Sequence, residues 1–263
     1  MDDSDPTPHQ PGSGSGSDAS ASDGTATPRH PIQQAADDAR EMVADSLAAM
    51  DDWVPSMRGM VHLIGAVIFA GLGTWLVVDS IEAGTTLVAL VYAVSVVAGL
   101  TVSALYHRVG RRGRFHRFWR RLDHSMILVW ISASYTPVLV LAVASGLSWV
   151  LLTLVWGLSV IGIATYFIVP TPPRWFRVGL PLGLGWVALV VLPDLSRSVQ
   201  WWMLGLIALG GVLYSIGALL YFYRWPNPLP RHFGFHEVFH LLVLAAAACH
   251  FAALYPLITR GTA

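Results

Sequence analysis

The sequence predicts an all-α protein that crosses a membrane seven times. Of its 263 residues, 54% are hydrophobic and only 12% are charged, whereas roughly 25% are charged in a typical soluble domain. Apolar segments of about 20 residues recur from Met60 to Ile258, and a helix of that length crosses a hydrocarbon core of about 30 Å. A membrane strand needs only about 9 to 11 residues, so the segments are too long for strands. We therefore expect a multi-pass protein of the cell membrane.

Two regions of the chain differ in composition. Residues 1–52 hold 11 of the 16 acidic residues, and their first part is rich in Gly, Ser, Asp and Pro. Such a segment buries too little apolar surface to offset the entropy that it would lose on ordering. We predict a disordered acidic cytoplasmic tail over residues 1–52 and a seven-helix transmembrane domain over residues 53–263.

The seven spans are separated by polar, glycine-containing or proline-containing stretches. The longest break is the arginine-rich stretch from Arg108 to Leu122, and a later break is placed at Pro193-Asp194. Proline ends helices because it lacks the backbone N–H and clashes with the preceding turn. The spans expected on this basis cover residues 60–78, 85–107, 124–143, 147–169, 175–192, 199–223 and 235–258.

The arginines predict the orientation of the domain. Seven of them lie between the second and third spans, and further pairs lie between spans four and five and between spans six and seven; the opposite loops and the C-terminus hold only Arg197 and Arg260. Basic loops stay in the cytoplasm, so the N-terminus is predicted inside and the C-terminus outside. Anionic membrane lipids are the expected partners of these arginines, rather than nucleic acid.

Three histidines at the predicted cytoplasmic ends of the spans form a candidate metal site. His236 and His240 are four residues apart at the start of the last span, so both imidazoles lie on one helical face. His107 closes the second span at the same depth. Three imidazoles with one open position are typical of catalytic zinc, which makes a bound water acidic. Zn²⁺ held by His107, His236 and His240 is therefore predicted.

Asp123 and Ser103 are the candidate catalytic residues beside this site. Asp123 opens the third span from the same side, and Ser103 lies four residues before His107 on the same helical face. A carboxylate in an apolar helix is expensive and is normally kept for function. We expect Asp123 to orient the water or accept its proton, and Ser103 to hold the site or the substrate through its hydroxyl.

Glu237 supports a competing hypothesis. His236 to His240 reads as H-E-x-x-H, in which the glutamate of a metalloprotease is the general base. Position 246 is alanine, so the extended pattern with a third histidine is not met. Single histidines near span ends are interpreted as interfacial polar residues, and this applies to His62, His116, His124 and His250.

Four stretches of the chain resemble the bacterial hemolysin III family, relatives of the adiponectin and progestin receptors. Together they span about residues 55–258, and their order and spacing are those of that family. The stretches are Arg58-Gly59-Met60-Val61-His62-Leu63, Ser103-Ala104-Leu105-Tyr106-His107-Arg108, Arg121-Leu122-Asp123-His124-Ser125-Met126-Ile127 with Ser134-Tyr135-Thr136-Pro137, and His236-Glu237-Val238-Phe239-His240 with Cys249-His250-Phe251.

The resemblance implies seven helices, an internal N-terminus and a zinc site near the cytoplasmic face formed by His107, His236 and His240. It also implies that Asp123 lies near the zinc-bound water with Ser103 beside it. Relatives often carry glutamine at the position of Glu237, which weakens the protease hypothesis. Alkaline ceramidases, distant relatives with a similar zinc site, hydrolyse lipid amides.

The expected function is hydrolysis of a lipid amide or ester by a zinc-activated water, with a lipid-like substrate reached from the membrane. The alternatives are a pore-forming hemolysin or channel that causes cytolysis, and a receptor-like protein with structural zinc. Spans one, two, four and five are almost free of charge, which disfavours a wide aqueous channel through one chain. The sequence predicts no particular oligomeric state.

Overall fold

The computed structural model describes residues 57–110, 114–143, 146–229 and 231–260. Within these ranges the chain is helical and contains no β-strand, and seven helical segments are long and apolar enough to cross a membrane. The predicted all-α, seven-span fold is confirmed. Trp53–Ala263 forms a compact unit of its own, and the predicted acidic tail lies outside the described residues. The sidedness of the termini stays a prediction.

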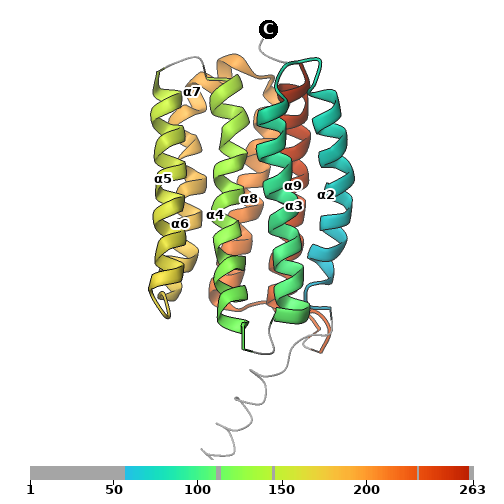
Figure 1. Cartoon of the computed structure of the whole chain (residues 1–263), viewed down its shortest axis with the longest axis vertical. Coiled ribbons are helices and arrows are strands. Elements are labelled where there is room, and N and C mark those ends of the chain that lie inside the picture. The colour runs from blue at the N-terminus through green and yellow to red at the C-terminus, as the bar shows by residue number, and fades with distance from the viewer. Residues whose placement is uncertain (1–56, 111–113, 144–145, 230, 261–263) are drawn as a thin grey trace, which may run out of the picture. The chain divides into compact units, whose positions relative to one another are not determined.

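The helices stand side by side with their axes close to parallel (Figure 1). The second span continues from α3 into a π-helix, η1, and a turn at Val187 divides the fifth span into α6 and α7. The elements are α2 (Met60–Asp79), α3 (Thr86–Leu105), η1 (Tyr106–Gly110), α4 (His116–Leu141), α5 (Leu147–Ile168), α6 (Arg174–Trp186), α7 (Ala188–Ser198), α8 (Trp201–Tyr223) and α9 (Phe235–Arg260).

Two predicted boundaries are wrong. Helix α4 begins at His116, so Arg117, Arg120 and Arg121 lie on its first turns and not in a loop. Pro193 lies inside α7 and does not end the fifth span, which runs to Ser198. Serine hydroxyls bond to carbonyls in this last part of α7, including Ser196 Oγ to the Pro193 oxygen at 2.8 Å.

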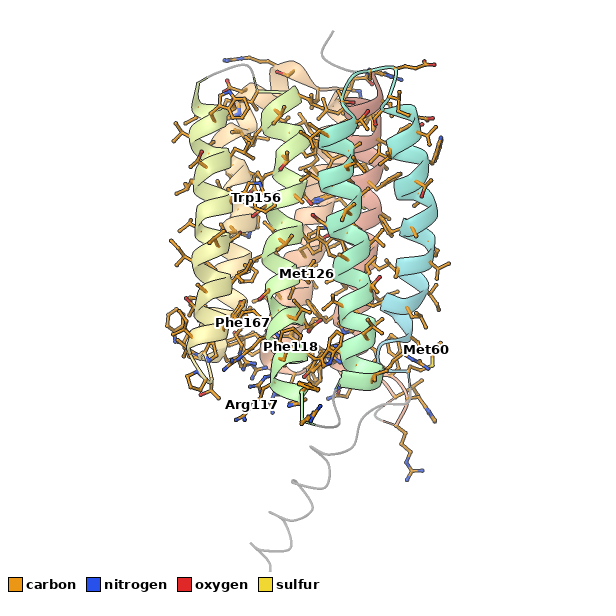
Figure 2. All side chains as sticks on the ribbon, viewed as in Figure 1. Met60, Arg117, Phe118, Met126, Trp156 and Phe167 are labelled. Atoms are coloured by element: carbon orange, nitrogen blue, oxygen red, sulfur yellow. The ribbon has the colours of Figure 1, made fainter. Side chains whose placement is uncertain are left out.

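The buried side chains form two clusters. One joins α2, α3 and α9 with parts of α4 and α7, and it includes Phe69, Leu100 and Phe251. The other joins α4 to α5, α6 and α7 and includes Leu128 and Val155. The outward faces of the helices are apolar as well, since many large aliphatic and aromatic side chains are exposed along them. A helix that is apolar on all sides is typical of a membrane span. Nitrogen-bearing side chains gather at the end of the bundle where Met60, Arg117 and Phe167 lie (Figure 2).

Candidate metal centre

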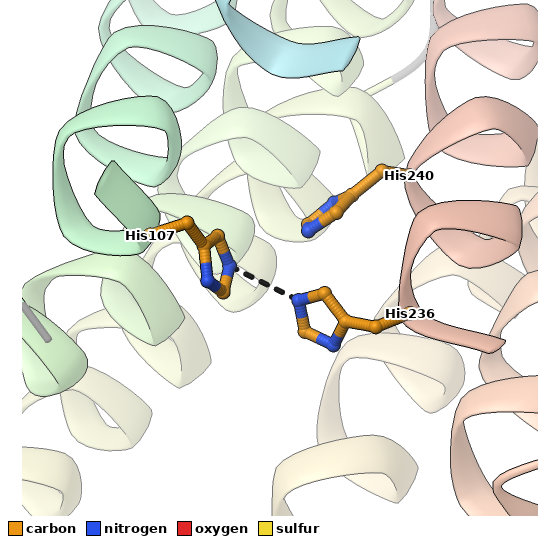
Figure 3. Close-up of side chains that lie close together, drawn as sticks. All are labelled: His107, His236 and His240. Atoms are coloured by element: carbon orange, nitrogen blue, oxygen red, sulfur yellow. Dashed lines mark hydrogen bonds between the residues drawn. The ribbon is translucent and has the colours of Figure 1, made fainter. Parts of the chain in front are cut away.

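Three imidazoles from two elements meet at this end of the bundle. His107 projects from η1, while His236 and His240 project from the first two turns of α9 (Figure 3). The Nε2 atoms of His107 and His236 lie 3.0 Å apart. One ligand atom from each of the three histidines lies within 4.8 Å of the other two. The structure therefore brings the three predicted ligands close enough to bind one metal ion.

The environment of His240 fits a metal ligand. Its side chain is 3% exposed, and neither ring nitrogen has a hydrogen-bond partner among the described residues. Buried polar atoms are nearly always satisfied, so a pair of unsatisfied nitrogens calls for a further partner such as an ion. Two nitrogens bound tetrahedrally to zinc at about 2.0–2.1 Å lie about 3.3 Å apart, close to the His107–His236 separation. The donor set thus fits Zn²⁺.

The local backbone at His107 is unusual. Helix α3 ends at Leu105 and the chain continues as five residues of π-helix. π-Helical turns occur frequently at functional sites because they redirect a side chain within a helix. At the end of η1, Gly110 packs directly against Trp119 of α4: a Cβ at Gly110 would lie 2.6 Å from Trp119 Cγ. This contact fixes α4 beside the histidine site.

Asp123 and Ser103 lie near each other. Ser103 is 5% exposed, and its hydroxyl lies near enough to the Asp123 carboxylate to interact with it. Asp123 follows Trp119 by four residues and shares its face of α4, which places the carboxylate toward the segment that carries His107. It is not one of the three mutually close ligand groups.

His62 is a member of the site that the sequence interpretation missed. It was expected to be an interfacial polar residue, but it is 5% exposed and its ring centroid lies 3.8 Å from that of His240. Neither of its nitrogens has a hydrogen-bond partner among the described residues. Its burial depends on the packing of α2 against α9, which no local pattern reveals. The available signal was its place in the motif that begins at Arg58.

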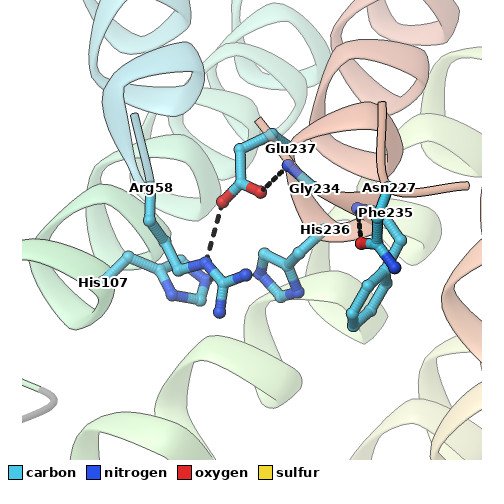
Figure 4. Close-up of polar contacts among 7 residues, drawn as sticks. All are labelled: Arg58, His107, Asn227, Gly234, Phe235, His236 and Glu237. Atoms are coloured by element: carbon cyan, nitrogen blue, oxygen red, sulfur yellow. Dashed lines mark hydrogen bonds and ion pairs between the residues drawn. The ribbon is translucent and has the colours of Figure 1, made fainter. Parts of the chain in front are cut away.

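Glu237 has a structural role in this arrangement. Arg58 Nε donates to its Oε1 atom at 2.8 Å, and the Gly234 N–H donates to its Oε2 atom at 2.8 Å (Figure 4). The second bond is one half of a capping box, in which the third residue of a helix reaches back to the N-cap N–H. Asn227 Oδ1 accepts a bond from the Phe235 N–H at 2.9 Å. The start of α9 is therefore fixed from both sides, and both Glu237 oxygens are engaged.

His250 also differs from its predicted interfacial role. His250 lies within α9, where its Nε2 bonds to the Ile207 carbonyl of α8 at 3.3 Å. His124 Nδ1 donates to the Arg120 carbonyl within α4 at 2.8 Å. His116 lies at the first residue of α4, near the Tyr106 hydroxyl. None of these three belongs to the group of mutually close ligands found in the described part of the chain.

Two bacterial proteins named as hemolysin-3 or its homolog are similar to this chain. The chain is 29% identical over 199 residues to hemolysin-3 of Bacillus cereus, covering 74% of this chain and 87% of that protein. It is 32% identical over 130 residues to a hemolysin-3 homolog of Bacillus subtilis, covering 49% of this chain and 58% of that protein.

A shorter similarity reaches a eukaryotic protein. Over 92 residues the chain is 37% identical to the ADIPOR-like receptor IZH2 of Saccharomyces cerevisiae, covering 31% of this chain and 29% of that protein. The family described as haemolysin-III related matches residues 54–251, which include every residue of the histidine site. The chain belongs to the haemolysin-III-related family of membrane proteins.

Proposed function

We propose that this protein is a zinc-dependent membrane hydrolase that cleaves an amide or ester bond of a lipid. The observation that carries the proposal is the group of three convergent imidazoles, one of them buried without a hydrogen-bond partner among the described residues. Structural zinc sites are usually closed by four protein ligands, whereas catalytic sites have three and leave one position open. The three-histidine group matches the catalytic pattern.

The residues have distinct roles in this proposal. His107, His236 and His240 would hold the ion. When bound, zinc supplies Lewis acidity that polarises a carbonyl and activates water at neutral pH. Ser103, whose hydroxyl interacts with the Asp123 carboxylate, would position that carboxylate by donating a hydrogen bond to it.

Asp123 would carry the proton during the reaction. Its carboxylate takes a proton from the attacking water as the new bond from oxygen to the carbonyl carbon forms. The same proton then passes to the leaving nitrogen or oxygen as the bond from that atom to the carbonyl carbon breaks. The products are a carboxylic acid and an amine or alcohol, and Asp123 returns to its ionised state. General acid–base steps of this kind contribute about 10²–10⁴-fold to a rate.

The surroundings of the site favour a lipid substrate. The helices that carry it expose apolar side chains on their outer faces, including Val67 and Leu87, so the protein is embedded among acyl chains. The protease alternative needs Glu237 as a free base, but both of its oxygens accept hydrogen bonds at 2.8 Å. A lipid amide or ester therefore fits the site better than a peptide.

The testing experiment is metal analysis by mass spectrometry on detergent-purified protein. We expect an equimolar amount of zinc in the wild type and its loss in a His236→Ala, His240→Ala double variant. His232→Ala is the matched control, because His232 is exposed and lies one turn further back in the sequence; this variant should keep its zinc. A screen of lipid amides and esters then follows. Wild-type protein that binds no zinc, even after zinc is added back, would refute the proposal.

A further inference from the structure

A pocket lies at the same end of the bundle but between different helices from those of the histidine site. Its walls come from the first turns of α4, the last turns of α5, the connecting segment and the first turn of α6. Its cavity volume is about 100 Å³ and it is partly open to the surroundings, so it suits a small group rather than a whole drug-sized ligand. The lining residues are Arg120, Arg121, His124, Tyr166, Pro170, Thr171, Pro172 and Arg177.

Several hydrogen-bond donors in this pocket are buried without a partner. The Nε atoms of Arg121 and Arg177 and the hydroxyl of Tyr166 have none among the described residues. Tyr166 is 2% exposed, so its hydroxyl is held away from water as well as from protein acceptors. Buried donors are nearly always satisfied in folded proteins. Three unsatisfied donors in one pocket indicate that an acceptor-rich ligand completes it.

The charge of the pocket is positive and is not neutralised by the protein. Three guanidinium groups line it, and no aspartate or glutamate does. The ion pairs among the described residues that involve arginine use Arg58 and Arg197 instead. The Asp123 carboxylate lies 3.9 Å from Nδ1 of His124, but Asp123 does not line the pocket and also interacts with Ser103. Like charges held close together repel unless an anion lies between them.

We propose that this pocket binds a phosphate group, carried either by an anionic phospholipid headgroup or by a soluble phosphate ester. Arginine presents planar, forked donors that match phosphate oxygens, and it never loses its charge in proteins. Arg121 and Arg177 face the pocket from α4 and α6, and Tyr166 adds a neutral donor from α5. A phosphate is an anion with several acceptor oxygens, so it satisfies the charge and all three donors together.

The position of the pocket suits a headgroup. It lies at the helix ends, on the side of the bundle where Arg117 and Phe167 are found (Figure 2). Lipid phosphates lie at the boundary between the hydrocarbon core and water, where clusters of arginine bind them. The pocket shares no residue with the histidine site, so the inference does not rest on the proposed hydrolase activity.

Binding of phosphatidic acid to the detergent-purified full chain, titrated by native mass spectrometry, tests the proposal. We expect saturable binding of a single lipid that is weakened about tenfold or more in Arg121→Gln, Arg177→Gln, a loss of at least about 1.4 kcal/mol. Arg117→Gln is the matched control, because Arg117 is an exposed arginine on the same helix that does not line the pocket. If the double variant does not fold, Tyr166→Phe replaces it in the test. This variant removes only the hydroxyl and should also weaken binding.

A parallel titration with glycerol 3-phosphate distinguishes the two sources of phosphate. Binding of phosphatidic acid alone supports a lipid headgroup, and binding of both probes supports recognition of the phosphate group itself. The His236→Ala, His240→Ala variant should bind both probes as the wild type does, which separates this site from the metal centre. Absence of saturable binding, or an equal loss in Arg117→Gln and in the pocket variants, would overturn the proposal.

Discussion

At the residue scale, Asp123 distinguishes a catalytic from a structural role for the metal. Asp123→Asn keeps the size of the side chain and an acceptor for Ser103 but removes the group that takes the proton. We expect lipid hydrolysis to fall by about 10²–10⁴-fold while the zinc content stays at the wild-type level. The measurement is turnover of the substrate found in the lipid screen, alongside metal analysis of the same sample. Unchanged turnover with zinc bound would remove Asp123 from the mechanism.

Glu237 gives a second prediction at this scale. Glu237→Gln must turn an N–H₂ group toward either Arg58 or Gly234, both of which are donors in the folded protein. We expect a loss of about 1–3 kcal/mol in stability, the cost of an unsatisfied buried group, with hydrolysis per folded molecule close to that of the wild type. Thermal denaturation and turnover are measured on one preparation. A collapse of turnover in folded, zinc-loaded protein would instead identify Glu237 as the base.

At the scale of the elements, the start of α2 supports the metal site through Gly59. This N-cap residue has φ +82°, and a Cβ placed on it would lie 3.0 Å from His107 Cβ. Gly59→Ala should therefore destabilise the protein by about 1–2 kcal/mol for the backbone conformation and also displace His107, which weakens zinc binding. Zinc affinity is measured by competition with a chelator.

Gly84→Ala is the control for Gly59→Ala. Gly84 has φ +68°, but a Cβ there meets nothing within 4 Å. It carries the same type of backbone strain without the contact with His107. If the two variants bind zinc equally well, Gly59 does not position His107.

The sequence predicted the seven spans because apolar length alone identifies them, and it predicted the three ligands because His236 and His240 share a helical face. It did not predict η1, since a π-helical turn has no local signature as clear as a hydrophobic period. The start of α4 was misplaced because arginines were interpreted as loop residues, whereas their long side chains extend from a helix end toward water. His62 was misjudged because its burial depends on contact with α9.

At the scale of the whole molecule, the arginine distribution predicts which end faces the cytoplasm. Ser196 and Arg117 are both exposed and are predicted on opposite sides of the membrane. In a Cys249→Ala background, a membrane-impermeant maleimide should label Ser196→Cys in intact cells but label Arg117→Cys only after the cells are opened. The reverse pattern would invert the predicted topology and place the histidine site outside.

The pairing of His107 with His236, 129 residues further along the chain, has a consequence for biosynthesis. The ribosome delivers the second span to the membrane before the seventh. His107 is therefore inserted before His236 and His240 have been synthesised. Arg58, at the head of the first span, likewise meets Glu237 only when the last span arrives. An ion held by all three histidines would therefore be captured only by a chain translated almost to its end, and its binding would mark completed assembly.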